Sequence, residues 1–335
     1  MDDLQPPSRQ KILIIRFSSI GDIVLTSPVV RAIKKQLPDV SLHFLTKKGF
    51  EPISKHNPHI DKVHVFTGNL QETLHELQTE KFDFVVDLQN NRRSHRITSV
   101  LGVPHQAFPK MNIKKWIVVN FKLNLLPDMH IVDRYFEAVK PLNVVNDNEG
   151  LDFFIPDNEV FDFDDLPAVF EDGYIAVSIA ANHNTKRIPV DKIVEIGRLL
   201  YKPMLLLGGQ DVSQIADEIV QELDERVYNG CGKFSLFTSA SIINQSDCVL
   251  TGDTGLMHIA AALNKPIASV WGNTIPEFGM YPYMPNHRER FRIFETNALW
   301  CRPCSKLGFK KCPLKHFNCM NKLSVVEVAE WINRF

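Results

Sequence analysis

No run of about 18 consecutive apolar residues, the length that spans a bilayer, occurs in this chain of 335 residues. Nor does one sign of charge dominate, because 38 Lys and Arg residues stand against 39 Asp and Glu residues and leave a net charge of -1. A chain this neutral has no overall field that would draw it to nucleic acid, and we expect no nucleic-acid partner. With only 16 Gly and 20 Pro residues and 44% hydrophobic residues, the composition excludes a collagen-like or mainly disordered chain and predicts a globular protein.

A secretory signal and the familiar phosphate-binding loops are missing as well. Met1 to Pro7 are acidic and polar, with no basic segment followed by an apolar one, so we expect a cytoplasmic protein. No G-x-G-x-x-G follows the first apolar run, and no G-x-x-x-x-G-K-[ST] occurs anywhere. These absences argue against a dinucleotide-dependent dehydrogenase and a P-loop nucleotidase.

Short apolar runs alternate with helical patterns along most of the chain. The strands are predicted at residues 12–15, 41–45, 63–66, 84–88, 174–179, 204–207, 248–250 and 267–271. The helices are predicted at residues 72–79, 190–200, 212–223 and 255–263, near Pro28, and after the capping box that begins at Ser324. Such alternation is typical of an α/β fold with parallel sheets.

The alternation loosens between residues 144 and 173 and then restarts. We therefore predict two Rossmann-like, doubly wound domains, at residues 1–160 and 173–335, joined by a linker at residues 161–172. Ligands of open α/β sheets bind outside the carboxyl ends of the strands, so the residues that follow the strands are the candidates for a site.

A turn of small residues follows the first predicted strand. Gly21 permits a close backbone approach there, and Asp22 would lie at the mouth of the site. A carboxylate in that place can accept a proton from a substrate hydroxyl. The alternative is that Asp22 merely starts the next helix, and the spacing alone favours that alternative.

A second turn, at residues 251–255, links a strand to a helix. Its backbone N–H groups and the positive end of the helix suit a diphosphate, although Asp253 or Thr254 could simply cap the helix. Lys186 follows another strand and would complement a diphosphate, or else lies in a solvated basic loop. Asp211 follows the strand at 204–207 and either accepts a ribose hydroxyl or caps its helix.

Together these segments resemble the ADP-heptose:lipopolysaccharide heptosyltransferases, glycosyltransferase family nine. The matching segments, in the family's order, are I-I-R-F-S-S-I-G-D-I-V-L-T-S-P at 14–28, F-D at 82–83 with D-L-Q-N-N-R-R-S at 87–94, K-R-I-P at 186–189, and D-T-G-L-M-H-I-A-A-A-L at 253–263. The resemblance covers nearly the whole chain. It implies the GT-B fold, with an N-terminal acceptor domain, a C-terminal nucleotide-sugar domain and a cleft between them.

The resemblance also implies roles for single residues. Asp22 matches the family's general base, and Lys186 matches the basic residue that contacts the donor diphosphate. The further donor-binding candidates are Asp211, Asp253, Thr254 and Gly255, and the acceptor-binding candidates are Ser18, Ser19, Gly21, Arg92 and Arg93. Arg92 and Arg93 could equally lie on a solvated helix face. The chain departs from the family pattern at residues 180–183, which lack the usual glycine, and at Ile188, where the family usually has Trp.

The predicted activity is therefore an inverting transfer of heptose from ADP-heptose to a lipopolysaccharide inner-core acceptor, a lipid-linked oligosaccharide. Asp22 would deprotonate the acceptor hydroxyl, and ADP would leave with its charge held by Lys186 and the helix N-terminus. This scheme requires no cofactor, and the D-x-D triplet at residues 162–164 lies in the predicted linker rather than after a strand. The alternatives are the same fold with another nucleotide sugar, or a non-catalytic relative that binds nucleotides or sugars.

Four of the six cysteines lie in the segment 301–319, as Cys301, Cys304, Cys312 and Cys319. Thiols of a cytoplasmic protein are expected to be reduced, and a cluster with one C-x-x-C pair can bind zinc. The two readings, a structural zinc site and free thiols, are open at this point. A zinc module that recruits a partner would be a third class of function.

Residues 110–126 mix lysines with apolar side chains. They predict either a surface that meets anionic lipid headgroups on the cytoplasmic face of the inner membrane, or an amphipathic segment that packs on the core with a solvated basic side.

Overall fold

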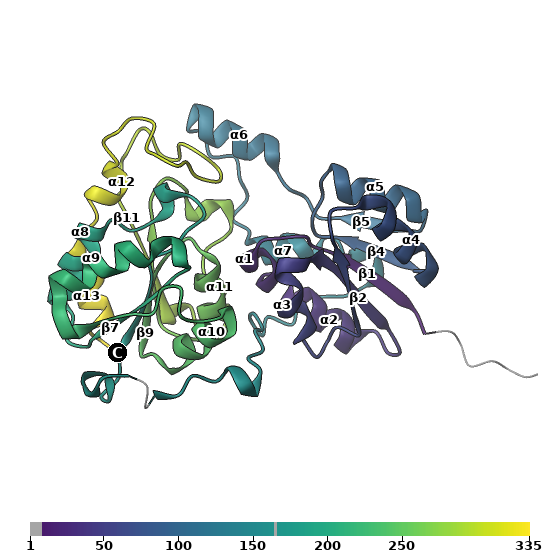
Figure 1. The fold of residues 1–335 in the computed structure, drawn as a ribbon. Coiled ribbons are helices and arrows are strands. Elements are labelled where there is room, and N and C mark those ends of the chain that lie inside the picture. Colours follow the sequence, from purple (N-terminus) through teal and green to yellow (C-terminus); the bar gives the residue numbers. More distant parts are fainter. Residues whose placement is uncertain (1–8, 164–165) are drawn as a thin grey trace, which may run out of the picture. The chain divides into compact units, whose positions relative to one another are not determined.

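The computed structural model of the protein describes residues 9–163 and 166–335 (Figure 1). The segment from Met1 to Pro7 and residue Asp164 of the D-x-D triplet lie outside the described residues. The chain forms two compact units. Unit 1 consists of the described residues up to Lys110 together with Ile131–Phe154, and unit 2 consists of Met111–His130 and Ile155–Phe335. Residues 111–130, which the sequence suggested as part of the first domain, thus pack with the second unit.

Unit 1 is built on a parallel sheet of five strands in the order β3-β2-β1-β4-β5. Its strands are β1 (Lys11–Ile15), β2 (Ser41–Lys47), β3 (Lys62–Phe66), β4 (Phe84–Asp87) and β5 (His105–Ala107). Its helices are α1 (Ile20–Val24), α2 (Ser27–Gln36), α3 (Glu51–Lys55), α4 (Leu70–Glu80), α5 (Arg92–Leu101) and α7 (Ile131–Phe136), with short 3-10 turns η1 (Lys48–Phe50) and η2 (Lys140–Leu142).

Unit 2 is built on a second parallel sheet, of six strands in the order β11-β10-β9-β6-β7-β8. Its strands are β6 (Ile175–Ser178), β7 (Met204–Leu207), β8 (Val227–Asn229), β9 (Cys248–Gly252), β10 (Ile267–Trp271) and β11 (Phe291–Glu295). Its helices are α6 (Asn112–Phe121), α8 (Val190–Leu199), α9 (Ser213–Leu223), α10 (Leu236–Gln245), α11 (Gly255–Ala262), α12 (Asn318–Asn321) and α13 (Val325–Ile332). The 3-10 turns are η3 (Asp157–Glu159), η5 (Ala168–Phe170), η6 (Asn184–Lys186), η7 (Gln210–Val212), η8 (Asp224–Arg226), η9 (Pro276–Phe278) and η10 (Arg288–Arg290).

The central strands are buried along their length because helices cover both faces of each sheet. In unit 1, Leu13 and Ile15 of β1 pack with Leu77 of α4 and Ile97 of α5, and Figure 1 shows both helices on that face. In unit 2, the strands β6, β7 and β9 pack against α8, α9 and α13 in one large core. The interiors of these strands are mostly apolar, although a few buried polar side chains such as His43 and His64 lie within β2 and β3, and most of the candidate polar groups follow the strand ends.

The predicted α/β fold with two parallel sheets is confirmed, and every predicted strand and helix is present. The strands that the sequence analysis missed are β5, β8 and β11, each at the edge of its sheet. Edge strands are half exposed, and β5 and β8 have only three residues each, so no buried apolar run marks them. No helix formed by residues 9–163 or 166–335 combines the length and the apolar character that a membrane crossing requires.

Candidate functional site

Asp22 lies in the first turn of α1, directly after the turn that follows β1. Its Oδ2 atom accepts hydrogen bonds from the backbone N–H of Ser19 at 3.0 Å and from the Ser19 hydroxyl at 2.8 Å. Its other oxygen pairs with Arg16 at 2.5 Å, and 24% of the Asp22 side chain is exposed. Asp22 therefore closes the first turn of α1, as the capping alternative requires, and part of its carboxylate is exposed.

The Arg16 guanidinium holds this carboxylate in place through the ion pair. Only 9% of its side chain is exposed, and it donates hydrogen bonds to the carbonyls of Ser18 at 3.0 Å and Leu88 at 2.5 Å. Burial lowers the pKa of Arg16, but the charge of Asp22 leads a set of acidic neighbours that raise it above its ordinary value. The guanidinium therefore stays charged and fixes Asp22, a role that the sequence analysis missed. A basic residue directly after a fully buried strand was the available signal.

The turn after β4 is tied to the turn after β1. The backbone N–H of Phe17 donates to Gln89 Oε1 at 2.9 Å, which joins the two turns across the sheet edge. Asp87, at the end of β4, is buried and accepts from the N–H groups of Gln89 and Asn90 and from the Ser94 hydroxyl. This buried carboxylate shapes the start of α5, where the two predicted acceptor arginines lie.

The two arginines have different surroundings. Arg93 lies over the Phe66 ring at 4.8 Å and over the Phe17 ring at 5.7 Å, two cation–π contacts that hold it near the β1 turn. Arg92 is exposed on the first turn of α5. The described contacts therefore bring Arg93, but not Arg92, toward the turn that contains Ser18, Ser19 and Gly21.

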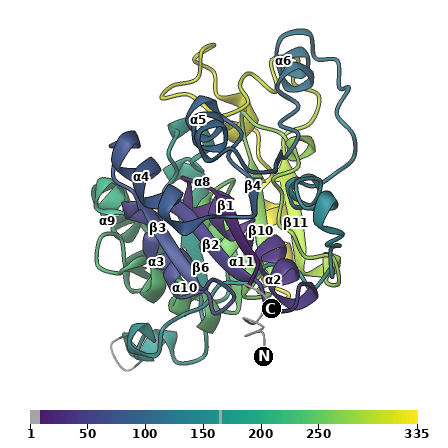
Figure 2. The ribbon, with the colours of Figure 1, turned by 90° about the vertical axis from the view of Figure 1, so that its right-hand side faces the viewer.

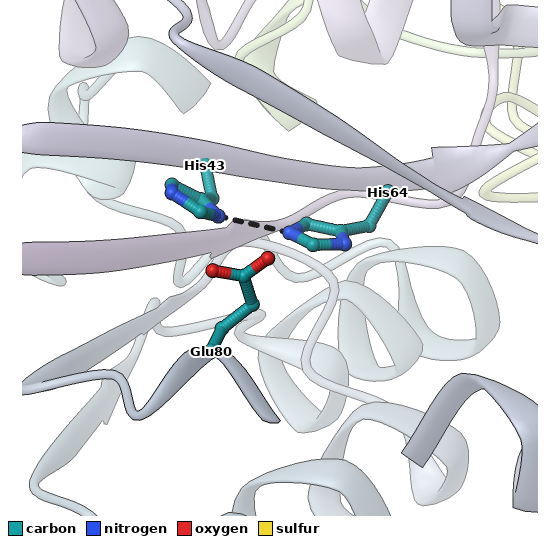
Figure 3. A group of neighbouring side chains, drawn as sticks. All are labelled: His43, His64 and Glu80. Carbon is teal, nitrogen blue, oxygen red and sulfur yellow. Dashed lines mark hydrogen bonds between the residues drawn. The ribbon is translucent and has the colours of Figure 1, made fainter. Parts of the chain in front are cut away.

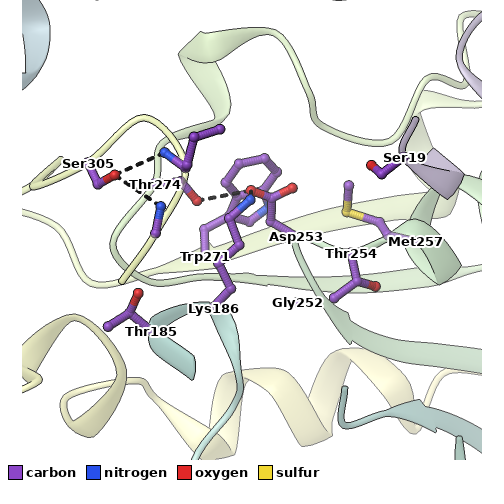
Figure 4. Close-up of polar contacts among 12 residues, drawn as sticks. Ser19, Thr185, Lys186, Gly252, Asp253, Thr254, Met257, Trp271, Thr274 and Ser305 are labelled. Carbon is purple, nitrogen blue, oxygen red and sulfur yellow. Dashed lines mark hydrogen bonds and ion pairs between the residues drawn. The ribbon is translucent and has the colours of Figure 1, made fainter. Parts of the chain in front are cut away.

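In unit 2, Lys186 and Thr274, which follow two different strands, both contact the carboxylate of Asp253, at the end of a third strand (Figure 4). Lys186, in η6 after β6, pairs with Asp253 Oδ2 at 2.5 Å. Thr274, after β10, donates to the same oxygen at 3.1 Å. The Lys186 side chain is 17% exposed and that of Asp253 10%, so the pair is largely shielded from solvent. Asp253 thus fixes the ammonium group beside the turn that leads into α11.

The turn that the sequence analysis predicted as a phosphate site leads into α11. Thr254 is the N-cap, but its hydroxyl lies 3.0 Å from the Thr251 hydroxyl and makes no cap hydrogen bond to the helix. The Thr254 side chain therefore leaves the first backbone N–H groups of α11 uncapped, at the positive end of the helix. Gly252 is required just before it, because a Cβ there would lie 2.6 Å from the carbonyl oxygen of Lys186. His258 is 2% exposed within α11, as expected of a packed histidine.

Asp211 lies in η7, after β7, and 65% of its side chain is exposed. It pairs with Arg187 at 2.8 Å, and Arg187 also donates to the carbonyl of Ala181 at 3.2 Å. The structure thus links Asp211 to the residue next to Lys186, although no contact joins it directly to the turn at Asp253.

The cysteine-rich segment is docked against these donor-side turns. The N–H of Phe309 donates to the Thr185 hydroxyl at 2.8 Å, and the N–H of Thr185 donates to the Phe309 carbonyl at 3.2 Å. Arg302 donates to the carbonyls of Gly272 and Thr274 and pairs with Glu295 at 2.5 Å. The segment therefore braces both Thr185, next to Lys186, and the backbone of Thr274.

The four thiols of this segment lie near one another but do not form a closed metal site. All four are free cysteines. Burial, followed by the neighbouring thiols Cys301 and Cys312, raises the pKa of Cys304, and burial followed by Cys304 raises the pKa of Cys319 to about 11. Two sulfurs bound to one zinc lie at most about 4.6 Å apart, because each Zn–S bond is about 2.3 Å. Within residues 9–163 and 166–335, no group of three ligand atoms taken from these thiols and His316 lies within 4.8 Å of one another. The zinc site stays a prediction.

One group of residues does bring three ligand atoms within 4.8 Å of one another, namely His43, His64 and Glu80 in unit 1 (Figure 3). His43 Nδ1 lies 2.9 Å from His64 Nε2, and His64 Nδ1 lies 2.5 Å from Glu76. The two oxygens of Glu80, however, already hold Lys11 at 2.9 Å and Lys62 at 2.5 Å. A divalent cation there would lie beside two ammonium groups. We therefore interpret the group as a buried hydrogen-bond network that ties β2 and β3 to α4.

Comparison with known proteins points to one family. Residues 71–315 match the profile of glycosyltransferase family 9 (heptosyltransferase). The chain is 25% identical over 309 residues to lipopolysaccharide heptosyltransferase 1 of Campylobacter coli. This alignment covers 84% of the present chain and 86% of the relative.

Solved structures of similar proteins share the fold. A family 9 glycosyltransferase from Veillonella parvula superposes with a TM-score of 0.75 at 20% identity and covers 98% of this chain and 99% of its own. The Escherichia coli ADP-heptose lipopolysaccharide heptosyltransferase II gives a TM-score of 0.71 at 18% identity, with 97% and 98% covered. The predicted GT-B fold class is thereby confirmed.

The histidine network predicts a specific pH dependence of stability. Burial, with a smaller effect of the neighbouring His64, lowers the pKa of His43 to about 4 from 6.5. Between pH 6.5 and 4 the unfolded chain therefore binds a proton that the folded chain does not, and the free energy of unfolding falls as the pH falls. Glu80, whose pKa the Lys62 contact lowers to about 2, loses its stabilising effect only as the pH falls from about 4.5 toward 2.

We expect the variant His43→Gln to reduce the loss of stability between pH 6.5 and 4.5 by about 2 kcal/mol, since one pKa unit corresponds to about 1.4 kcal/mol. Urea unfolding at several pH values measures this slope. The exposed His75 on α4 offers a matched control, His75→Gln, which should leave the slope unchanged. Equal slopes in the wild type and in His43→Gln would show that His43 does not titrate with folding.

Proposed function

The chain belongs to glycosyltransferase family 9, the heptosyltransferases, and we propose that it transfers a heptose from ADP-heptose to an inner-core acceptor of lipopolysaccharide, with inversion at the anomeric carbon. The observation that carries the proposal is the donor-side arrangement in unit 2. A shielded lysine, fixed by Asp253, lies beside a helix start whose first amides are not capped by Thr254. That is a cation and an array of N–H donors placed for a diphosphate.

The donor proposal is also supported by a relative. The Escherichia coli protein with the same fold is named for ADP-heptose, and the Campylobacter coli relative is named for lipopolysaccharide. In this chain the diphosphate would contact Lys186 and the amides at Thr254 and Gly255. We propose that Asp211, paired with Arg187, lies near the nucleoside.

The proposed reaction is a single displacement. The Asp22 carboxylate takes the proton of the acceptor hydroxyl, and that oxygen forms a bond to the anomeric carbon of the heptose. The bond between the anomeric carbon and the phosphate oxygen breaks, and ADP leaves with both electrons of that bond. Its developing charge is stabilised by Lys186 and by the N-terminus of α11. Arg16 does not react; it holds Asp22 in place.

The acceptor-side proposal rests on unit 1. Ser18, Ser19 and Gly21 form the turn around Asp22, and Arg93 lies over Phe17 at the same turn. A guanidinium there suits the acidic groups of a lipid-linked oligosaccharide. We include Arg92 as an exposed partner in that role. A cytoplasmic location and a structural zinc at Cys301, Cys304, Cys312 and Cys319 remain parts of this proposal.

The base role of Asp22 predicts a separation of turnover from donor binding. Asp22→Asn should lower the transfer rate by at least about 100-fold, because general base catalysis typically contributes 100- to 10,000-fold. Binding of ADP, measured by calorimetry, should stay within about twofold. Glu72→Gln removes an exposed acid from the same unit and serves as the control for both measurements.

Because Asp22→Asn also leaves the buried Arg16 without its partner, thermal unfolding has to accompany the rate measurement. A protein that folds, binds ADP and retains the wild-type rate would remove Asp22 from the chemistry. An equal loss of ADP affinity and of rate would assign Asp22 to the donor instead.

The role of Lys186 predicts selective loss of nucleotide affinity. Lys186→Ala should weaken ADP binding about 10- to 100-fold, since a charge-assisted contact is worth about 1.5–3 kcal/mol. Lys192→Ala, on α8 of the same unit, removes a lysine that pairs with Glu195 in its own turn and should change little.

The same calorimetry, repeated with UDP and GDP, tests the donor base. Preference for ADP supports the proposed donor. A stronger response to UDP or GDP would replace the donor but keep the fold and the displacement. Unchanged ADP affinity in Lys186→Ala would remove that residue from the site.

A further inference from the structure

An unusual surface of unit 2 joins α6 to the cysteine-rich segment. On α6 and the residues after it, the side chains of Ile113, Trp116, Phe121 and Leu123 are exposed. So are those of Trp300, directly before the cysteine-rich segment, and Leu307, within it. Trp116 is 57% exposed and Trp300 77%, values unusual for the largest apolar side chain. We call these six residues, with the lysines named below, the basic-apolar face.

The two halves of the face are connected. Lys122, the C-cap of α6, donates from its Nζ to the carbonyl of Pro303 at 2.6 Å, and Pro303 lies between Cys301 and Cys304. Figures 1 and 2 both show α6 next to the yellow loop that precedes α12. The hydrogen bond and the two views thus place α6 beside the cysteine-rich segment, although the two are far apart in the sequence.

The opposite side of α6 is already packed. Val118 is 2% exposed and forms a small apolar cluster with Ile275 and Phe278. Lys115 lies over the Phe278 ring at 5.9 Å. The sequence predicted that this segment either packs on the core or meets anionic lipid. Packing on the core accounts for one side of α6, but the side with Ile113, Trp116 and Phe121 lies outside the core.

The charge on the face has one sign. The sequence contains no Asp or Glu at residues 111–127 or 296–326, although the whole chain has 39 of them and a net charge of -1. The exposed lysines of these two stretches are Lys114, Lys122, Lys306, Lys310, Lys311, Lys315 and Lys322. Two segments that carry lysines and no acidic residue, within a chain of nearly neutral net charge, are complementary to an anionic partner.

We propose that the basic-apolar face binds the surface of an anionic lipid bilayer, with its lysines among the headgroups and its apolar side chains at the depth of the acyl-chain boundary. Trp is the side chain that membrane interfaces favour most, and lysines flanking it add attraction to anionic lipids. A second copy of the chain docking through the same face would bring the two sets of lysines together, so the charge argues against self-association. Binding of this face to a bilayer does not depend on the proposed function. The benefit that we expect from it, access to a lipid-linked acceptor, does rest on the proposed function.

Vesicle binding of the full chain tests the proposal. We expect co-sedimentation with vesicles of phosphatidylcholine containing 30% phosphatidylglycerol (roughly the anionic content that gives a strong surface potential). Binding should weaken at least about tenfold in pure phosphatidylcholine or in high salt, because the attraction of lysines is screened. No binding to the anionic vesicles, or equal binding to both compositions, would overturn the proposal.

Two pairs of variants locate the contact. Lys310→Gln with Lys311→Gln should lower the partition coefficient about 30-fold, since each basic residue near an anionic surface contributes roughly fivefold. Trp116→Ser with Trp300→Ser should lower it by a similar factor through loss of insertion. The matched controls are Arg198→Gln and Tyr201→Ser, which remove an exposed charge and an exposed aromatic elsewhere in unit 2 and should change binding less than twofold.

A spectroscopic measurement on the unmodified protein is independent of how the variants fold. The chain has four tryptophans, of which Trp271 and Trp331 are buried. Anionic vesicles should therefore shift the emission of the exposed Trp116 and Trp300 to shorter wavelength and protect them from acrylamide. Binding without such a shift, or a shift that coincides with dimer formation in light scattering, would contradict insertion. ADP calorimetry on the same sample shows separately whether the proposed function holds.

Discussion

Burial of the central strands on both faces is the constraint on which the rest of this structure depends. β1, β4, β6 and β9 lie deep between helices, so their interiors hold apolar side chains, and polar groups become possible only where the strands end. Parallel pairing brings those ends to one edge of each sheet. The candidate residues of unit 1 therefore lie at the ends of β1 and β4, and those of unit 2 lie at the ends of β6, β9 and β10.

At each of these edges, one ion pair holds the group to which we assign the main role. Arg16 fixes Asp22 in unit 1, and Asp253 fixes Lys186 in unit 2. Arg16 is less exposed than Asp22, and Asp253 is less exposed than Lys186. Further hydrogen bonds anchor these two less exposed residues: Arg16 donates to the carbonyls of Leu88 and Ser18, and Asp253 accepts from Thr274. Such pairs orient a charged side chain in advance, so little ordering is left for the moment when a ligand binds. The cysteine-rich segment adds to this by bracing the backbone next to Lys186 and Thr274.

The sequence was sufficient to predict the fold class and the candidate residues, because buried strands and G-D and D-T-G turns leave local patterns. It did not reveal Arg16 as the partner of Asp22, or Thr274 as the partner of Asp253, because these contacts join residues that only the folded turns bring together. The edge strands β5, β8 and β11 were missed because half-exposed strands lack an apolar run. The exposed face of α6 could not be distinguished from a core-facing one, because Val118 and Trp116 are both apolar and only packing against Ile275 and Phe278 separates them. The network of His43, His64 and Glu80 had no signal in the sequence, since its members lie on three separate elements.

We propose that these turns carry out heptosyl transfer from ADP-heptose, and mass spectrometry of a heptose-free inner-core acceptor, after incubation with the purified protein and ADP-heptose, tests this directly. We expect the acceptor to gain the mass of one heptose while ADP is released in equal amount, and NMR of the product to show the inverted anomeric configuration. An unmodified acceptor with ADP-heptose, together with a modified one when a different nucleotide sugar is supplied, would contradict this proposal.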